Sequence, residues 1–280
     1  MATVQPQVPH AVIDGKSYGA FPNPALTKDG EPVSAMGHLI DYNKSADGTF
    51  RFLQLIDRVC QAISLVLEEF NSTLAIYFKD LAGKFATAWV FMNYARLPSV
   101  TKDAWEAVTD LSGPQAATTR DSIDRVDKLF HGGAAWGYVI SYLTDSLGVR
   151  TIADVVDVIG TTAGLTLACD DWFKAKKHLE HLKTHDATNG LLQQRFAETQ
   201  LEAFWRIVKN VASIASGVLG LLVLAFGGPV LSAAALLTIS LISTIAAMTA
   251  HFTKATNTYE LVDFYKVREP RVLLTGSAVY

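Results

Sequence analysis

The chain has 280 residues and a formal net charge of −3, so it is long enough for one large domain or two smaller ones. Half of its residues are apolar and 18% are charged, whereas soluble domains average about 25% charged residues. No block of lysines and arginines stands out, which argues against a nucleic-acid partner. The two cysteines, Cys60 and Cys169, are too few for a disulfide framework.

Residues 1–48 contain five of the nine prolines of the chain and follow neither a helical nor an alternating apolar pattern. Such a composition predicts a disordered or extended N-terminal arm. The segment also lacks a basic stretch followed by an apolar one, so we do not expect a secretory signal peptide.

Residues 49–204 are predicted to form an amphipathic helical region. Between Phe52 and Phe70, apolar residues recur every three or four positions, which indicates a helix with one buried face. An aromatic-rich helix is expected over 72–97, because Pro98 ends it. Further helices are expected over 118–130, over 136–147 and from 152 into the charged stretch that ends near 189. Strand-like alternation occurs only in fragments, so the sequence predicts an all-α protein, a multi-helix bundle.

Residues 205–252 carry a bilobed hydrophobic helical hairpin. His251 is the only ionisable residue between positions 210 and 253. Gly227, Gly228 and Pro229 supply the turn between the lobes 211–226 and 230–250. At about 1.5 Å per residue the second lobe is about 31 Å long and the first about 24 Å, against a hydrocarbon core of about 30 Å.

Two interpretations of this hairpin stay open: a transmembrane pair, which the length of the charge-free second lobe favours, and the buried core of a soluble protein. The first lobe reaches spanning length only with an interface collar, formed by Trp205, Arg206 and Lys209 before it and by Lys254 after the second lobe. Basic flanks at both outer ends predict cytosolic termini. Residues 253–280 are expected to be a short amphipathic tail. Small residues at four-residue steps indicate close helix packing under either interpretation: Ala212, Ser216 and Gly220 on one line, Ser213 and Gly217 on the next.

Candidate chemical sites are few. His178, His181 and His185 share one helical face that could hold a metal ion through imidazole nitrogens. A solvated polar face is the favoured interpretation, because no second helix offers a completing ligand and nearby lysines repel cations. The aspartates at 154, 157, 170 and 171 are likewise assigned to a polar helix face. No phosphate-binding loop or catalytic motif is present, so we expect neither enzymatic activity nor a cofactor.

The lobes 211–226 and 230–250 and their Gly227-Gly228-Pro229 turn resemble the inclusion membrane proteins of chlamydiae, which share such a two-lobed segment. This resemblance covers the hairpin alone. It implies type III secretion, insertion into a host vacuole membrane and termini in the host cytosol, where helices recruit host proteins. The layout is also similar to that of peroxisome-proliferation membrane proteins, with residues 50–70 as the analogous surface helix.

The leading hypothesis is therefore a non-enzymatic, membrane-anchored interaction protein of bacterial effector type. The alternative is a soluble all-α adaptor or effector whose hairpin forms the buried core. A membrane is the expected partner under the first hypothesis. The sequence does not identify a protein partner, and a homo-oligomer is compatible with both hypotheses.

Overall fold

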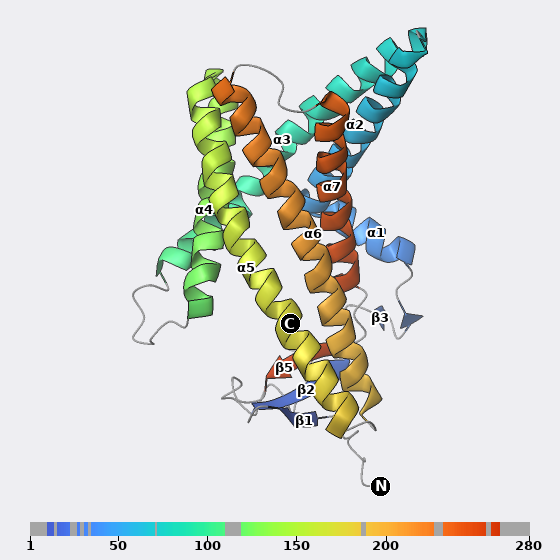
Figure 1. Cartoon of the computed structure of the whole chain (residues 1–280), viewed down its shortest axis with the longest axis vertical. Coiled ribbons are helices and arrows are strands. Elements are labelled where there is room, and N and C mark those ends of the chain that lie inside the picture. Colours follow the sequence, from blue (N-terminus) through green and yellow to red (C-terminus); the bar gives the residue numbers. More distant parts are fainter. Residues whose placement is uncertain are drawn as a thin grey trace.

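The structure is a computed structural model that describes residues 10–13, 16–22, 27–28, 31–32, 35–70, 72–109, 119–185, 189–226, 232–255 and 259–263. Within these ranges it contains seven helices and five short strands (Figure 1). The helices are α1 (Ala35–Lys44), α2 (Ala46–Glu69), α3 (Thr73–Thr109), α4 (Thr119–Thr144), α5 (Leu147–His185), α6 (Gly190–Phe226) and α7 (Ala233–Ala255). The strands are β1 (His10–Ile13), β2 (Lys16–Pro22), β3 (Thr27–Lys28), β4 (Glu31–Pro32) and β5 (Tyr259–Asp263). The predicted all-α multi-helix bundle is confirmed.

Helices α3 and α4 are longer than their sequence patterns predict. The prediction that Pro98 ends a helix is wrong, because α3 passes through it to Thr109. In the same way α4 passes through Gly132 without a break. A Cβ atom on Gly132 would lie 2.8 Å from Cβ of Ala104, so this glycine allows α4 to approach α3 closely.

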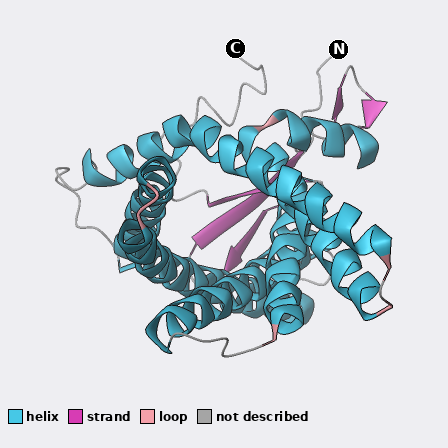
Figure 2. Ribbon diagram, turned by 90° about the horizontal axis from the view of Figure 1, so that it is seen from above, coloured by secondary structure: helices cyan, strands magenta, loops and turns pink. Residues whose placement is uncertain are grey.

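Helices α2 to α7 form a closed ring. Each helix packs along its neighbours in the sequence, and α7 closes the ring by packing against α2. Figure 1 shows that consecutive helices run in opposite directions, and Figure 2 shows them surrounding a central region through which the strands below are visible. Each helix therefore presents one face to the interior of the ring and another to the outside.

A small antiparallel sheet joins segments from opposite ends of the chain. β2 pairs with β1 and, on its other edge, with β5, so that Tyr18 lies opposite Asp263. This sheet and the β3–β4 pair are extended segments within the arm over 1–48, which was predicted to be disordered or extended, and helix α1 begins near its end. β5 likewise gives strand structure to part of the tail predicted over 253–280. The sequence does not reveal these strands because they are short, and because the partner of β5 lies at the other end of the chain.

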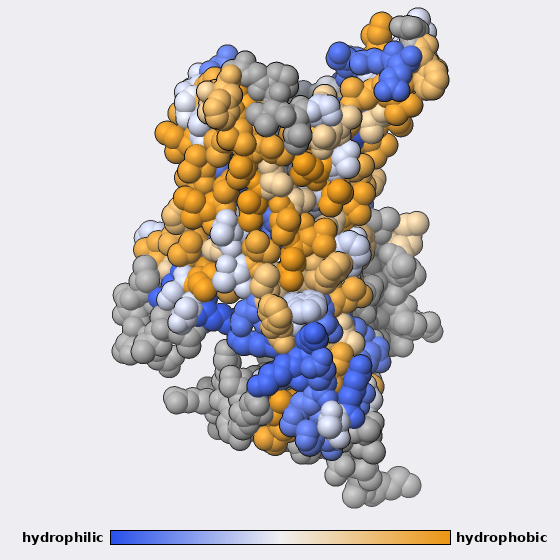
Figure 3. Space-filling view, in the orientation of Figure 1, coloured by the Kyte–Doolittle hydropathy of each residue, from blue (hydrophilic) through white to orange (hydrophobic). Residues whose placement is uncertain are grey.

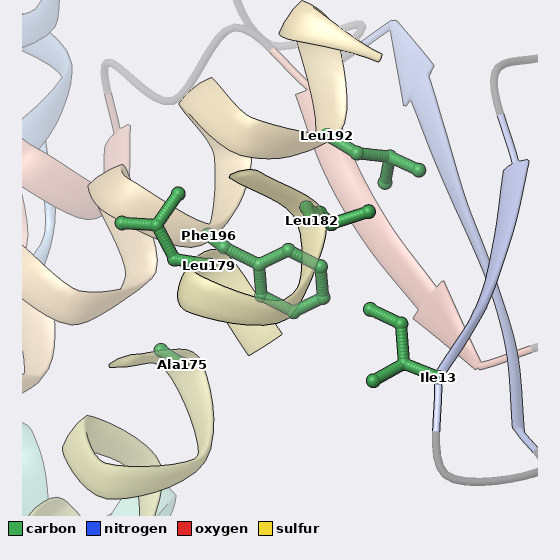
Figure 4. Packing of buried hydrophobic residues seen from close by; sticks show 6 residues of the cluster. All are labelled: Ile13, Ala175, Leu179, Leu182, Leu192 and Phe196. Carbon is green, nitrogen blue, oxygen red and sulfur yellow. The ribbon is translucent and has the colours of Figure 1, made fainter. Parts of the chain in front are cut away.

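The sheet covers a compact apolar core at the lower ends of α5 and α6. Ile13 of β1 points into it and is 1% exposed. Figure 4 shows this side chain facing four buried residues of the two helices together with Ala175, namely Leu179, Leu182, Leu192 and Phe196. This end of the molecule therefore has the covered core of a soluble protein.

Candidate functional site

Among the residues that the structure describes, three helices are long and apolar enough to cross a membrane: α5, α6 and α7. The last two contain the predicted hairpin lobes, although α6 begins at Gly190 and α7 ends at Ala255, so neither helix stops at the predicted limits of 205 and 252. The third, α5, was missed by the sequence pattern, because Asp154 and Asp157 interrupt its apolar residues. The turn residues Gly227, Gly228 and Pro229 lie outside the described residues.

The apolar parts of these helices are largely uncovered. Only 11% of the most apolar window of α6 is buried, against 33% for α7 and 39% for α5. Figure 3 shows a broad apolar surface over the upper part of the molecule and a hydrophilic surface below it. Large apolar side chains are exposed on four helices: Trp136, Ile140 and Leu143 of α4, Ile152, Val155 and Ile159 of α5, Val211, Val218 and Leu224 of α6, and Ile242 and Ile245 of α7. The hairpin is therefore not the buried core of this single chain.

A network of ion pairs marks the lower edge of the apolar surface. Arg120 of α4 pairs with Asp170 and, at 2.6 Å, with Asp171 of α5. Asp171 also binds Arg206 of α6 at 2.9 Å, and Asp170 binds Lys174 at 2.6 Å. From this network to the upper ends of α4, α5 and α6, the helices are each about 30 to 37 Å long at about 1.5 Å per residue. That length matches a hydrocarbon core of about 30 Å.

Only some residues of the predicted interface collar lie at this lower edge of the apolar surface. Arg206 belongs to the ion-pair network, and Trp205 beside it packs its ring 5.4 Å from that of Phe204. Lys254 at the end of α7 lies in electrostatic range of Glu202, which also faces Arg206. Lys209 differs, because it lies among the charges of Arg51, Asp127 and Asp157 on three other helices. These neighbours place Lys209 towards the interior of the ring.

The small residues of α6 take several different roles. Ser213 forms a hydrogen bond with Ser243 of α7, with the two hydroxyl oxygens 2.7 Å apart. A Cβ atom on Gly217 would lie 2.6 Å from Cγ2 of Val158, so this glycine brings α6 close to α5. Ala212 is buried and Ser216 is half-buried, whereas nothing lies within 4 Å of a Cβ atom at Gly220. The stripe thus contacts both neighbours of α6, except at its upper end.

The three histidines considered for metal binding do not converge. His178 is buried, and its ring centroid lies 5.0 Å from that of Tyr18 and 5.2 Å from that of Phe196. His181 and His185 stack on each other at 4.4 Å, and His185 is exposed. Within the described part of the chain no group of three or more histidine, cysteine, aspartate or glutamate residues could hold a metal ion. His178 is part of the aromatic packing beneath the sheet.

A second polar cluster lies higher up, between α4, α5 and α6. Nδ1 of His131 is 3.2 Å from Oδ1 of Asp127, and Nε2 is 3.9 Å from Oδ1 of Asp157. Two turns of α4 further up, the Tyr138 hydroxyl donates to Asp154 at 2.9 Å. The sequence pattern assigned Asp154 and Asp157 to a polar helix face and did not single out Asp127. Their position on the helix distinguishes these aspartates from ordinary solvated residues, because they lie on the side opposite the exposed apolar residues of the same helix.

Glycines on α5 make room for this cluster. A Cβ atom on Gly160 would lie 2.9 Å from Nδ1 of His131, and one on Gly164 would lie 2.8 Å from Oδ1 of Asp127. Oδ1 of Asp127 is buried and accepts no hydrogen bond from the described residues. The two glycines are four residues apart, so they lie on the same face of α5 and match Asp127 and His131, which have the same spacing on α4.

Comparisons with protein-family models, with curated proteins and with solved structures found no match to this chain.

Proposed function

We propose that this protein is a membrane-anchored helical protein whose ring of helices is embedded in a bilayer above the ion-pair network. The observation that carries the proposal is the outward apolar surface of α4 to α7, which is about as tall as a hydrocarbon core and ends at the pairs of Arg120, Asp170, Asp171 and Arg206. Exposing so much contiguous apolar surface to water is unfavourable, whereas lipid removes that cost.

The sheet supports a topology for the anchored protein. Because β2 and β5 are paired, the segments before α1 and after α7 lie on the same side of the ring. Consecutive antiparallel helices return the chain to that side. The basic residues that flank the apolar hairpin, Arg195, Arg206 and Lys254 among them, favour the cytosol for this side.

The anchoring proposal is tested by extracting membranes that contain the full-length protein with alkaline carbonate and then with detergent. We expect the protein to stay in the pellet after carbonate and to enter solution as a single species in detergent. Recovery of a monodisperse protein without detergent would show that the apolar surface is covered in another way, as in a soluble oligomer.

The finer proposal is a non-enzymatic effector that acts by recruiting other proteins. It is supported by the resemblance of residues 211–250 to the two-lobed segment of inclusion membrane proteins and by the lack of a catalytic motif in the sequence. The test is a full-length reporter fusion expressed in a bacterium that has a type III secretion system and lives in a vacuole. We expect the reporter at the vacuole membrane. Its retention inside the bacteria would contradict secretion and leave the anchoring proposal to its own test.

A further inference from the structure

Aromatic side chains gather on α5 and α6 at the height of the ion-pair network. Trp172 and Phe173 lie next to the network in α5, and their ring centroids are 5.0 Å apart. Phe204 and Trp205 directly precede Arg206 in α6, and the ion pair of Arg206 with α5 holds the two aromatic pairs at one height. Tryptophan is enriched where the hydrocarbon of a bilayer meets its head groups. These four residues, the aromatic band, therefore mark the head-group level on α5 and α6.

The exposed side of α5 changes from apolar to basic at the aromatic band. Phe173 is 64% exposed and follows the exposed Val155 by 18 residues, which is five full turns at about 100° per residue, so both side chains lie on the same side of the helix. Lys176 and Lys177 are exposed as well and lie within about 60° of Phe173 around the helix axis. The side of α5 that carries exposed apolar residues above the band thus carries lysines directly below it.

The segment of α5 below the network is basic. Residues 172–185 have a net charge of +3 with neutral histidines, because they contain four lysines and one glutamate: Lys174, Lys176, Lys177, Lys183 and Glu180. Residues 190–205 of α6, which lie beside this segment, contain one arginine and two glutamates, a net charge of −1. The network itself is balanced, with two arginines and two aspartates. The sum of +3 and −1 leaves two positive charges at the edge of the apolar layer.

The lysine side chains of α5 lean towards the apolar layer. In an α-helix each Cα–Cβ bond tilts towards the N-terminus, and the N-terminus of α5 is its upper end (Figure 1). Lys174 follows this direction, because its Nζ lies 2.6 Å from Oδ2 of Asp170, one turn above it. Lys176 follows it too, since its Nζ lies 5.3 Å from the ring centroid of Trp172, also one turn above. These ammonium groups therefore reach up to the aromatic band, while their aliphatic stems cover the helix surface.

We infer that residues 172–177 of α5 bind the phosphate groups of anionic phospholipids at the lower edge of the apolar layer. The inference rests on the proposed membrane anchoring. The position selects a lipid head group as the occupant, because the lysines reach the level at which the outer apolar face ends and the phosphates of a surrounding bilayer begin. Each lysine near an anionic membrane surface strengthens binding about fivefold, and salt screens the attraction.

The test measures which lipids contact the full-length protein in phosphatidylcholine vesicles. Spin-labelled phosphatidylserine or spin-labelled phosphatidylcholine is added in trace amounts, and electron paramagnetic resonance gives the fraction of each label that the protein immobilises. At about 0.1 M salt we expect phosphatidylserine to be preferred at least about twofold, since only some of the lipids around the ring contact this segment. At about 1 M salt the preference should be lost.

Lys176→Gln and Lys183→Gln form the matched pair of variants on α5. Both positions are exposed and lose one charge, but residue 183 lies ten residues below Phe173, about 15 Å away, which exceeds the screening length of about 10 Å at 0.1 M salt. Lys176→Gln, alone and then combined with Lys177→Gln, should lower the preference in steps, whereas Lys183→Gln should leave it unchanged. Equal effects at positions 176 and 183 would show that the overall charge of the protein sets the preference, which overturns the site.

The remaining outcomes separate the lipid site from the anchoring. If neither label is immobilised, no lipid surrounds the protein, and the membrane anchoring itself is contradicted. If both labels are immobilised equally, the anchoring stands and the site for anionic lipid is overturned. We expect inorganic phosphate to have no more effect than sodium chloride of equal ionic strength. A preference that phosphate alone removes would mean that the lysines bind the free anion, which also overturns the lipid site.

Discussion

At the scale of single residues, close approach between helices and burial of polar groups decide which positions tolerate change. Gly160 and Gly220 are both helical glycines, yet their surroundings are opposite. A Cβ atom at Gly160 would lie 3.2 Å from the backbone nitrogen of His131, whereas nothing lies within 4 Å of one at Gly220. The same substitution should therefore have opposite effects at the two positions.

We predict that Gly160→Ala lowers the free energy of unfolding by about 1–3 kcal/mol, because the methyl group forces α4 away from α5. Gly220→Ala is the matched control and should be neutral or stabilising by up to about 1 kcal/mol, since alanine favours the helix. Thermal unfolding of both variants in the same detergent measures the difference. Equal effects at the two positions would contradict the close α4–α5 contact.

Tyr42 links α1 to the lower end of α7, where its ring centroid lies 4.1 Å from that of His251 and 5.5 Å from that of Phe252. Burial raises the pKa of Tyr42 from 10.0 to about 12, and the charge of Asp47 adds to the effect. The folded state therefore holds the phenol proton more tightly than the unfolded state does. Its contribution to stability is complete below about pH 10 and is lost as the pH rises towards about 12.

Removing the phenol should flatten this alkaline dependence. We predict that unfolding temperatures measured from pH 9 to pH 12 fall less steeply for Tyr42→Phe than for the unchanged protein. His251→Ala, which removes a ring that packs against Tyr42, should flatten the profile in the same way, because the pKa of Tyr42 then lies closer to its value in the unfolded chain. A Tyr42→Phe profile parallel to that of the unchanged protein would show that other groups set the alkaline limit.

At the scale of elements, a charged substitution on the outer faces of α5, α6 and α7 shows whether these faces lie in lipid or in water. Val218 on α6 is 40% exposed. In water a lysine at such a surface position changes stability by at most about 0.5 kcal/mol. In the middle of a bilayer it costs about 2.5–3.5 kcal/mol.

We therefore predict that Val218→Lys reduces the membrane-inserted fraction and the stability of the protein. The control is Thr184→Lys, an exposed position on α5 below the ion-pair network, which should change neither. The measurements are the fraction retained after alkaline extraction and chemical unfolding in micelles. A neutral effect of Val218→Lys in both would argue that this face of α6 lies in water.

At the scale of the whole molecule, the sheet constrains where the chain enters and leaves the ring. In the β2–β5 register Ala20 lies opposite Leu261. Opposite residues of antiparallel strands have Cα atoms about 4.5–5.5 Å apart, which is within the range for a disulfide. The two segments can be linked only if they lie on the same side of the membrane.

We predict that Ala20→Cys combined with Leu261→Cys, with Cys60 and Cys169 replaced by Ala, forms an intramolecular disulfide under mild oxidation. Gel mobility before and after reduction detects it. The control pairs Ala20→Cys with Thr144→Cys at the upper end of α4, on the other side of the layer, and should not form the bond. Lack of the 20–261 bond under conditions that oxidise accessible thiols would contradict the paired strands.

The all-α class and the apolar hairpin could be predicted from the sequence, because helical periodicity and a long charge-free segment are local properties of the chain. The sequence also located the small residues of α6, although not the neighbours that they contact. The ends of α3 and α4 could not be predicted from Pro98 and Gly132, because packing between the two helices overrides the local preferences of both residues.

Which side of each helix faces the interior depends on how the helices pack against one another, and the sequence pattern did not predict it. Asp157 and His131 look like ordinary polar-face residues in the sequence, and Lys209 looks like an interface anchor. The closed ring of α2 to α7 turns all three inwards and leaves the apolar faces of α4 to α7 outside. It also brings β5 to β2 across almost the whole length of the chain. Such contacts depend on how distant segments meet in space, and no local pattern records that arrangement.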